Sequence, residues 1–167
     1  MAGKSAVRTA LSAIFVIAML GYFAWTQISQ RALNGYLDQV RPHLVAGEKV
    51  MEDFSAWGGK WEGKDTDTIN SEWQGFVDRY EAVAAGIVAA KSDDSSEIQP
   101  MKAELDTFGN KRLEWLKVLL VVHKQAGETG PADQATAEAL LKESNAALER
   151  FVVLKKAYFK KYKLTEK

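Results

Sequence analysis

The sequence predicts an all-α protein, in which a single N-terminal transmembrane helix is followed by an extracytoplasmic four-helix bundle with up-down-up-down topology. Three observations lead to this fold class. Residues 6–28 form one apolar run, which is about as long as the roughly 20 residues that a helix needs to cross a bilayer. Later segments carry apolar residues at alternating spacings of three and four, which is typical of helices that pack against helices. No segment shows the strict alternation of a half-buried strand.

The apolar run divides the chain into three parts. Residues 1–5 are predicted to be a short cytoplasmic N-terminus, residues 6–28 a transmembrane anchor, and residues 29–167 a periplasmic or otherwise extracytoplasmic domain. The anchor carries no charge from Ala10 to Trp25, so none of its side chains opposes insertion into hydrocarbon. The anchor residues expected to contact lipid or the headgroup layer are Leu11, Ile14, Phe15, Ile17, Leu20, Tyr22 and Trp25.

Charge determines the predicted orientation of the anchor. Lys4 and Arg8 precede the run, and no acidic residue occurs before Asp38; positive residues beside a membrane helix favour the cytoplasmic side. A cleaved signal peptide would share the basic start and the apolar centre, but the run ends in bulky aromatic residues where a cleavage site needs small ones. The sequence therefore favours an uncleaved, single-pass anchor in the inner membrane.

The first bundle helix is expected over residues 29–57, directly continuous with the anchor because no Gly/Pro cluster separates them. Pro42 lies inside this segment and lacks a backbone N–H, so we expect a kink or a division of the helix there. Three glycines then end the helix, and an acidic or hydroxyl side chain at 65–67 caps the next one. The apolar seam of the first helix comprises Leu33, Leu37, Val40, Leu44, Gly47, Met51 and Phe54.

The second helix is expected over residues 68–91 and the third over residues 97–125. Alanines surround the second half of the second helix, so we expect a neighbouring helix to approach closely there. In the third helix, Pro100 fits the first turn, and residues 118–122 are apolar on every side. We interpret that run either as the most buried turn of the helix or as a patch covered by a partner. The two apolar stripes are Ile69, Trp73, Phe76, Tyr80, Val83 and Ile87, and then Met101, Leu105, Phe108, Leu113, Leu116, Leu119 and Leu120.

The fourth helix is expected over residues 132–162, and the predicted topology returns its C-terminal end to the membrane. Two interpretations of this end remain open. It is either a basic-aromatic tail at the membrane interface or an ordinary basic helix end that opposes the helix dipole. The inward residues are Leu140, Leu141, Leu148, Phe151, Val152 and Leu154, and the tail residues are Lys155, Lys156, Tyr158, Phe159, Lys160, Lys161, Tyr162 and Lys163.

Trp57 and Trp61 flank the glycine-rich turn at the tip that is farthest from the membrane. Tryptophan is enriched at interface hot spots, so the pair is a candidate partner contact. The simpler interpretation, which we favour, is that both rings cap the end of the bundle core.

Catalytic and metal-binding motifs are missing from the sequence. The chain has no cysteine and only two histidines, His43 and His123, and neither histidine has a neighbouring carboxylate at the spacing of a bundle metal site. There is no glycine-rich phosphate loop and no Ser-His-Asp arrangement. We therefore predict no enzymatic activity, no cofactor, no metal and no small-molecule substrate.

The charge distribution argues against a nucleic-acid partner. Residues 30–154 carry 14 Lys and Arg against 21 Asp and Glu, a balance of −7, while residues 155–167 carry six Lys against one Glu, a balance of +5. The body therefore offers no basic face of the kind that binds nucleic acid. The membrane and other subunits of a membrane complex are the expected partners.

The function expected from these features is that of a non-catalytic accessory or scaffolding subunit of a larger bacterial inner-membrane complex. Two alternatives remain. An anchored extracytoplasmic four-helix bundle resembles the sensory domain of bacterial chemoreceptors in architecture, which implies ligand binding, although this sequence has no second membrane helix. The other alternative is a membrane-tethered chaperone or assembly module.

Overall fold

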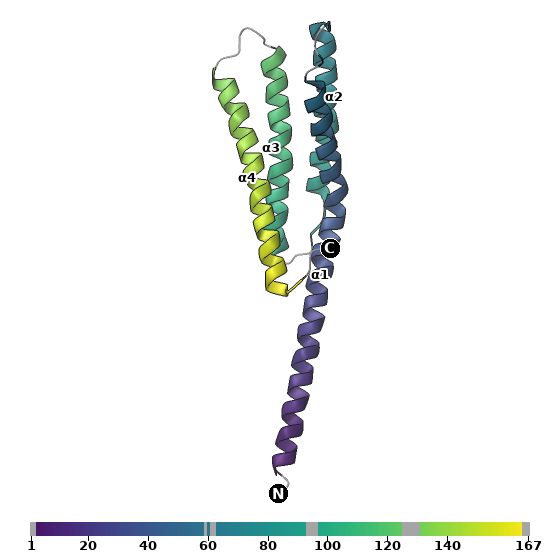
Figure 1. Cartoon of the computed structure of the whole chain (residues 1–167), viewed down its shortest axis with the longest axis vertical. Coiled ribbons are helices and arrows are strands. Elements are labelled where there is room, and N and C mark those ends of the chain that lie inside the picture. The colour runs from purple at the N-terminus through teal and green to yellow at the C-terminus, as the bar shows by residue number, and fades with distance from the viewer. Residues whose placement is uncertain (1–2, 59, 61–62, 93–96, 125–130, 165–167) are drawn as a thin grey trace.

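A computed structural model of the chain describes residues 3–58, 60, 63–92, 97–124 and 131–164, with side chains described from residue 24 onward except at 124, 131 and 132. These residues form four helices and no strand. The chain runs up α1, down α2, up α3 and down α4 (Figure 1). The predicted all-α four-helix bundle is therefore confirmed. The helices are α1 (Gly3–Trp57), α2 (Thr66–Ala89), α3 (Ile98–Lys124) and α4 (Pro131–Tyr162).

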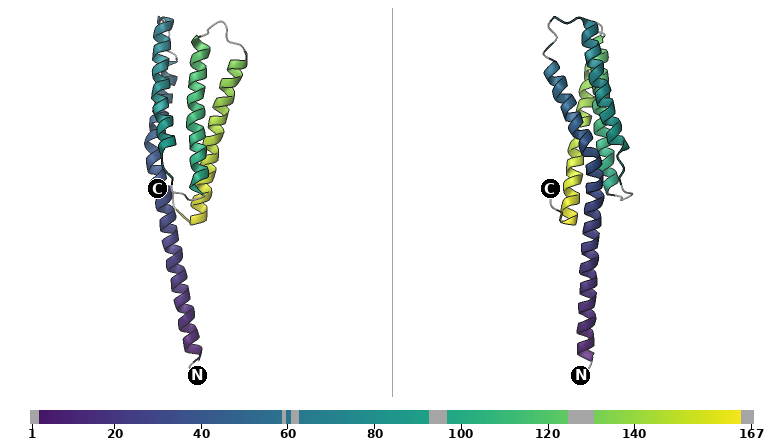
Figure 2. Two further views of the ribbon diagram at one scale, coloured as in Figure 1. Left: turned by 180° about the vertical axis from the view of Figure 1, so that it is seen from behind. Right: turned by 90° about the vertical axis from the view of Figure 1, so that its right-hand side faces the viewer.

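α1 is one continuous helix, as expected from the lack of a break between the predicted anchor and the first bundle segment. Pro42 lies inside the helix and does not divide it. In the right-hand view of Figure 2, the upper part of α1 leans away from the line of its N-terminal part. A proline removes one backbone hydrogen bond, and a helix that is packed along both flanks of the proline can absorb this loss as a bend.

The ends of the other three helices lie within two residues of the predicted ends, and local hydrogen bonds explain them. Asp65 is the N-cap of α2: its Oδ1 accepts from the Thr68 N–H at 2.7 Å and its Oδ2 from the Thr68 hydroxyl at 2.9 Å. α4 ends where Lys163 takes a left-handed φ of 51°. The N–H of Leu164 then donates to the carbonyl of Phe159 at 2.9 Å, the bond of a Schellman motif.

The N-terminal part of α1 extends alone beyond the other three helices (Figure 1). In the part of the chain whose side chains are described, no helix is long and apolar enough to cross a membrane. The predicted anchor over 6–28 lies mostly before that part. Its residues Leu11, Ile14, Phe15, Ile17, Leu20 and Tyr22 are outside the described side chains.

Small residues let the helices approach closely where α1, α2 and α3 meet. A Cβ at Gly86 of α2 would lie 2.2 Å from the ring of His43 in α1, and one at Gly109 of α3 would lie 3.3 Å from Ile87. This confirms the expected close approach beside the second half of α2. In contrast, α1 and α4 touch only sparsely, so the bundle has one open side, between α1 and α4.

The core follows the predicted stripes, with two corrections. Residues 118–122 are not the most buried turn of α3, because Val121 is 50% exposed, and Val152 of α4 is 39% exposed rather than inward. The patch interpretation of 118–122 stays a prediction. Several buried positions fall outside the predicted stripes, among them Tyr36, Val50, Val77, Ser144, Ala147, Tyr158 and Tyr162.

Candidate functional site

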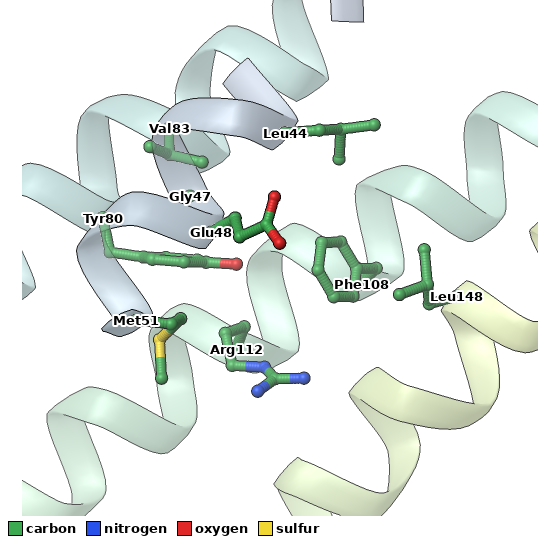
Figure 3. Close-up of a pocket in the computed structure, with 9 residues that line it drawn as sticks. All are labelled: Leu44, Gly47, Glu48, Met51, Tyr80, Val83, Phe108, Arg112 and Leu148. Carbon is green, nitrogen blue, oxygen red and sulfur yellow. The ribbon is translucent and has the colours of Figure 1, made fainter. Parts of the chain in front are cut away.

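The open side of the bundle contains a cavity of about 350 Å³ to which all four helices contribute. Its walls are mostly apolar, and three polar side chains reach into it (Figure 3). A cavity of this volume lies at the lower end of the roughly 300–1,000 Å³ typical of small-molecule sites. The lining residues are Leu44, Gly47, Glu48 and Met51 of α1, Tyr80 and Val83 of α2, Phe108 and Arg112 of α3, and Leu148 of α4.

Arg112 brings a positive charge to the floor of this cavity. Its guanidinium carbon lies 5.6 Å from the ring centre of Phe108 and 5.8 Å from that of Trp115. Its Nε donates to Ser144 Oγ at 3.2 Å and its Nη2 donates to Asn145 Oδ1 at 2.5 Å. These contacts with α4 hold the guanidinium in one orientation.

Among the described residues, no carboxylate forms an ion pair with Arg112. Burial lowers the pKa of its guanidinium, and the nearby Tyr80 opposes this only in part. A partly buried cation without an anionic partner is unusual in a protein interior, because desolvation of the charge is not offset by a neighbouring charge. Arg112 is therefore the most distinctive group of the cavity.

Glu48 and Tyr80 reach into the same cavity from α1 and α2. In Figure 3 the carboxylate of Glu48 and the guanidinium of Arg112 lie on opposite sides of the Tyr80 hydroxyl. Burial raises the pKa of Tyr80 to about 12, so its hydroxyl stays protonated and can donate or accept a hydrogen bond at neutral pH. The absence of a side chain at Gly47 leaves room for Tyr80 and Val83, whose atoms would lie 3.5 and 3.1 Å from a Cβ there.

Trp57, one of the two predicted tip residues, is buried in an aromatic cluster at the far end of the bundle. Only 8% of it is exposed, its ring stacks on Phe54 at 5.8 Å, and its Nε1 donates to Glu72 Oε2 at 2.5 Å. Lys64 donates to the same oxygen at 2.5 Å, and together Lys64 and Trp57 lower the pKa of Glu72. Trp61 lies outside the described residues.

The two histidines contact different ends of α2 rather than each other. His43 packs over Gly86, and His123 stacks on Trp73 with ring centres 5.3 Å apart. In the part of the chain with described side chains, no group of three or more His, Asp or Glu is arranged to hold a metal ion.

Two aromatic residues of the predicted tail are buried at the base of the bundle. Tyr158 is 5% exposed, and its hydroxyl donates to the carbonyl of Ser29 in α1 at 2.9 Å. Tyr162 packs against Tyr158 at 4.5 Å and against the edge of Trp25 at 4.8 Å. These rings therefore join the C-terminal end of α4 to α1.

The basic residues of the tail lie around this contact. Lys161 pairs with Glu97, whose Oε1 also accepts from the Tyr162 hydroxyl at 3.1 Å. The ammonium of Lys155 lies 5.7 Å from the ring centre of Phe159. The exposed lysines of the tail are Lys156, Lys160, Lys161 and Lys163.

The sequence interpretation did not identify the cavity residues Glu48 and Arg112. A signal for Arg112 was present: Met101, Leu105, Phe108 and Leu116 set a spacing of three and four that places residue 112 on the buried face of α3. A charged residue at a core position of a helix is the pattern to look for. Glu48 stands next to the seam position Gly47, and its pattern alone does not separate it from a solvated side chain.

No protein-family model matches this chain, and neither a curated protein nor a solved structure is significantly similar to it. The functional argument therefore depends on the geometry of the molecule itself.

Proposed function

We propose that this protein is a non-catalytic accessory or scaffolding subunit of a larger inner-membrane complex, anchored by the N-terminal part of α1 with its bundle outside the cytoplasm. One observation carries the proposal. α1 continues past the bundle without a break or a neighbouring helix of this chain, and residues 9–30 of this helix contain no charged side chain. A lone apolar helix needs lipid or another chain around it.

The base of the bundle supports the same arrangement. Tyr158 and Tyr162 bring the end of α4 beside Ser29 and Trp25, where the uncharged stretch of α1 ends. The exposed lysines of the tail would then lie next to the headgroup layer, where each Lys near an anionic surface contributes about 1 kcal/mol to membrane attraction. Both features fit a bundle that stands directly on the membrane.

Exposed apolar residues on the bundle support contacts with other subunits. Val45 of α1 is 60% exposed and Val153 of α4 is 65% exposed. Single exposed valines are common on monomers, so they support the proposal only together with the anchor. The larger interface would be formed by the anchor helix.

The first test is gentle detergent extraction of the tagged full chain, followed by a native gel and mass spectrometry of the co-migrating proteins. We expect stoichiometric co-migration with a large membrane complex. Exchange of residues 6–28 for an unrelated membrane span should release the protein from the complex and keep it in the membrane. Migration of the native chain as a free monomer or dimer would refute the subunit proposal.

Orientation can be tested separately, because the chain has no cysteine to interfere with labelling. Ser5→Cys and Lys156→Cys place one thiol on each side of the proposed anchor. In spheroplasts, a membrane-impermeant maleimide should label the Lys156→Cys protein and should reach the Ser5→Cys protein only after lysis. Labelling of both thiols before lysis would contradict a membrane-spanning anchor.

A second candidate function is favoured by the cavity at Arg112. A ligand-binding module needs a concave, mostly apolar site with a few convergent polar groups, and the open side of the bundle has these features.

A further inference from the structure

The cavity on the open side of the bundle presents two opposite charges that do not neutralise each other. Glu48 enters it from α1 and Arg112 from α3, and no ion pair joins them. The remaining walls are apolar apart from the Tyr80 hydroxyl and the backbone of Gly47. A ligand in this space would meet a cation receptor, an anion receptor and an apolar surface.

Arg112 is prepared to bind an anion. A guanidinium has five N–H donors in a fixed plane, and Ser144 and Asn145 accept two of them. The bonds to α4 and the rings of Phe108 and Trp115 fix the plane, while the other donors have no partner among the described residues. Such a group can hold a carboxylate with little loss of side-chain freedom.

We propose that this cavity binds a small zwitterion of the α-amino-acid class with an apolar side chain. The ligand carboxylate accepts hydrogen bonds from Arg112, the ligand ammonium group donates to Glu48, and the ligand side chain packs against the apolar wall that includes Leu44. This function goes beyond the proposed role as a subunit and does not depend on it.

The charges decide between this ligand class and simpler ones. A plain carboxylic acid would bind Arg112 but would bring a second negative charge towards Glu48. A plain amine would pair with Glu48 and be repelled by Arg112. An uncharged apolar molecule would cover the guanidinium without satisfying its donors, which is costly for a buried polar group.

Isothermal titration of the full chain in mild detergent tests the proposal, with L-leucine and L-phenylalanine as probes. Each probe is compared with its deaminated acid and its decarboxylated amine, 4-methylpentanoate and 3-methylbutylamine for leucine, and 3-phenylpropanoate and 2-phenylethylamine for phenylalanine. We expect saturable binding of at least one amino acid. Binding of the matching acid and amine should be about 10-fold or more weaker, because each lacks one charge-assisted hydrogen bond.

Two variants assign the charges to their receptors. Arg112→Gln should weaken amino-acid binding by about 10- to 100-fold. Glu48→Gln should weaken it less and should reduce the preference for the amino acid over its deaminated acid. Arg41→Gln is the matched control, because Arg41 is an exposed α1 residue that pairs with Asp38 away from the cavity, and its binding should match that of the native chain.

Three results would overturn the proposal. They are no saturable binding of either amino acid at about 10 mM, equally tight binding of the deaminated acid, or unchanged amino-acid binding in a folded Glu48→Gln protein. If Arg112→Gln fails to fold, as judged by circular dichroism, the exposed Glu48 variant and the ligand series still decide. The native-gel result is independent, so failure of the subunit proposal would remain distinguishable.

Discussion

Replacement of Arg112 by methionine should leave the bundle as stable as the native protein, or up to about 1 kcal/mol more stable. This is the opposite of the usual result for a side chain that makes two hydrogen bonds. The reason is that Arg112 carries a partly buried charge without a carboxylate partner among the described residues. Methionine removes the charge and keeps a long side chain between Phe108 and Trp115.

The magnitude follows from the groups around the guanidinium. Its hydrogen bonds to Ser144 and Asn145 are worth roughly 1.5–3 kcal/mol each for a charged donor, and the two ring contacts add about 0.5–1 kcal/mol each. Desolvation of the ion costs several kcal/mol, and the lowered pKa of Arg112 shows that burial outweighs these compensations.

The substitution also leaves no buried polar atom without a partner. The Ser144 hydroxyl, which is fully buried, still donates to the carbonyl of Phe108 at 3.1 Å. Asn145 is exposed and can bond to water. Sulfur–aromatic contacts of about 0.3–1.5 kcal/mol replace part of the cation–π energy. The loss and the gain therefore nearly cancel, with a small balance in favour of methionine.

Urea unfolding of the full chain in mild detergent, followed by circular dichroism and tryptophan fluorescence, measures the effect. Arg112→Ala is the control for lost packing, and we expect it to be about 1–2 kcal/mol less stable, because it removes contacts with both rings. A loss of more than about 1.5 kcal/mol in Arg112→Met would refute the reasoning. It would show that the guanidinium is a structural tie between α3 and α4.

Three further predictions concern other parts of the bundle. Gly86→Ala should lower the unfolding free energy by about 1–3 kcal/mol through overpacking on His43, and His43→Ala in the same chain should restore most of it in urea unfolding. Lys163→Gly should raise the unfolding free energy by about 1 kcal/mol, because glycine accepts the left-handed φ of 51°. The raised pKa of Tyr80 means that its stabilising effect is complete below pH 10 and is lost as the pH rises towards 12, since only the unfolded chain ionises readily there; a pH series with Tyr80→Phe should show a shallower decline.

The helices and their seams could be predicted because packing produces a period of three and four along each segment. Residues such as Leu33, Val40, Tyr80 and Leu105 were predicted inward and are almost fully buried. The turn at residue 65 was also predictable, because an aspartate before a helix caps it by a local bond. The open side between α1 and α4 was not, because no periodic pattern reports which pairs of helices remain apart.

The C-terminal end shows how composition can hide periodicity. Lysines interleaved with aromatic rings are typical of a membrane interface, and this led to the interpretation of Tyr158 and Tyr162 as tail residues. Both tyrosines also continue the buried face of α4 that contains Phe151, at spacings of seven and four. A tyrosine can satisfy both roles only if its ring is buried and its hydroxyl finds a partner, as Tyr158 does at Ser29.

The polar residues within the helical seams are more informative than the apolar ones. Arg112 in α3 and Ser144 in α4 occupy positions where leucine or alanine would continue the apolar stripe, and they bond to each other across the two helices. If Arg112→Met is as stable as the native chain, the fold does not need the charge. A partly buried guanidinium that contributes nothing to stability, faces a cavity and lies across from Glu48 is then accounted for by binding. If the variant is instead much less stable, the same residues form a structural network between α3 and α4, and the cavity loses its strongest argument for a ligand.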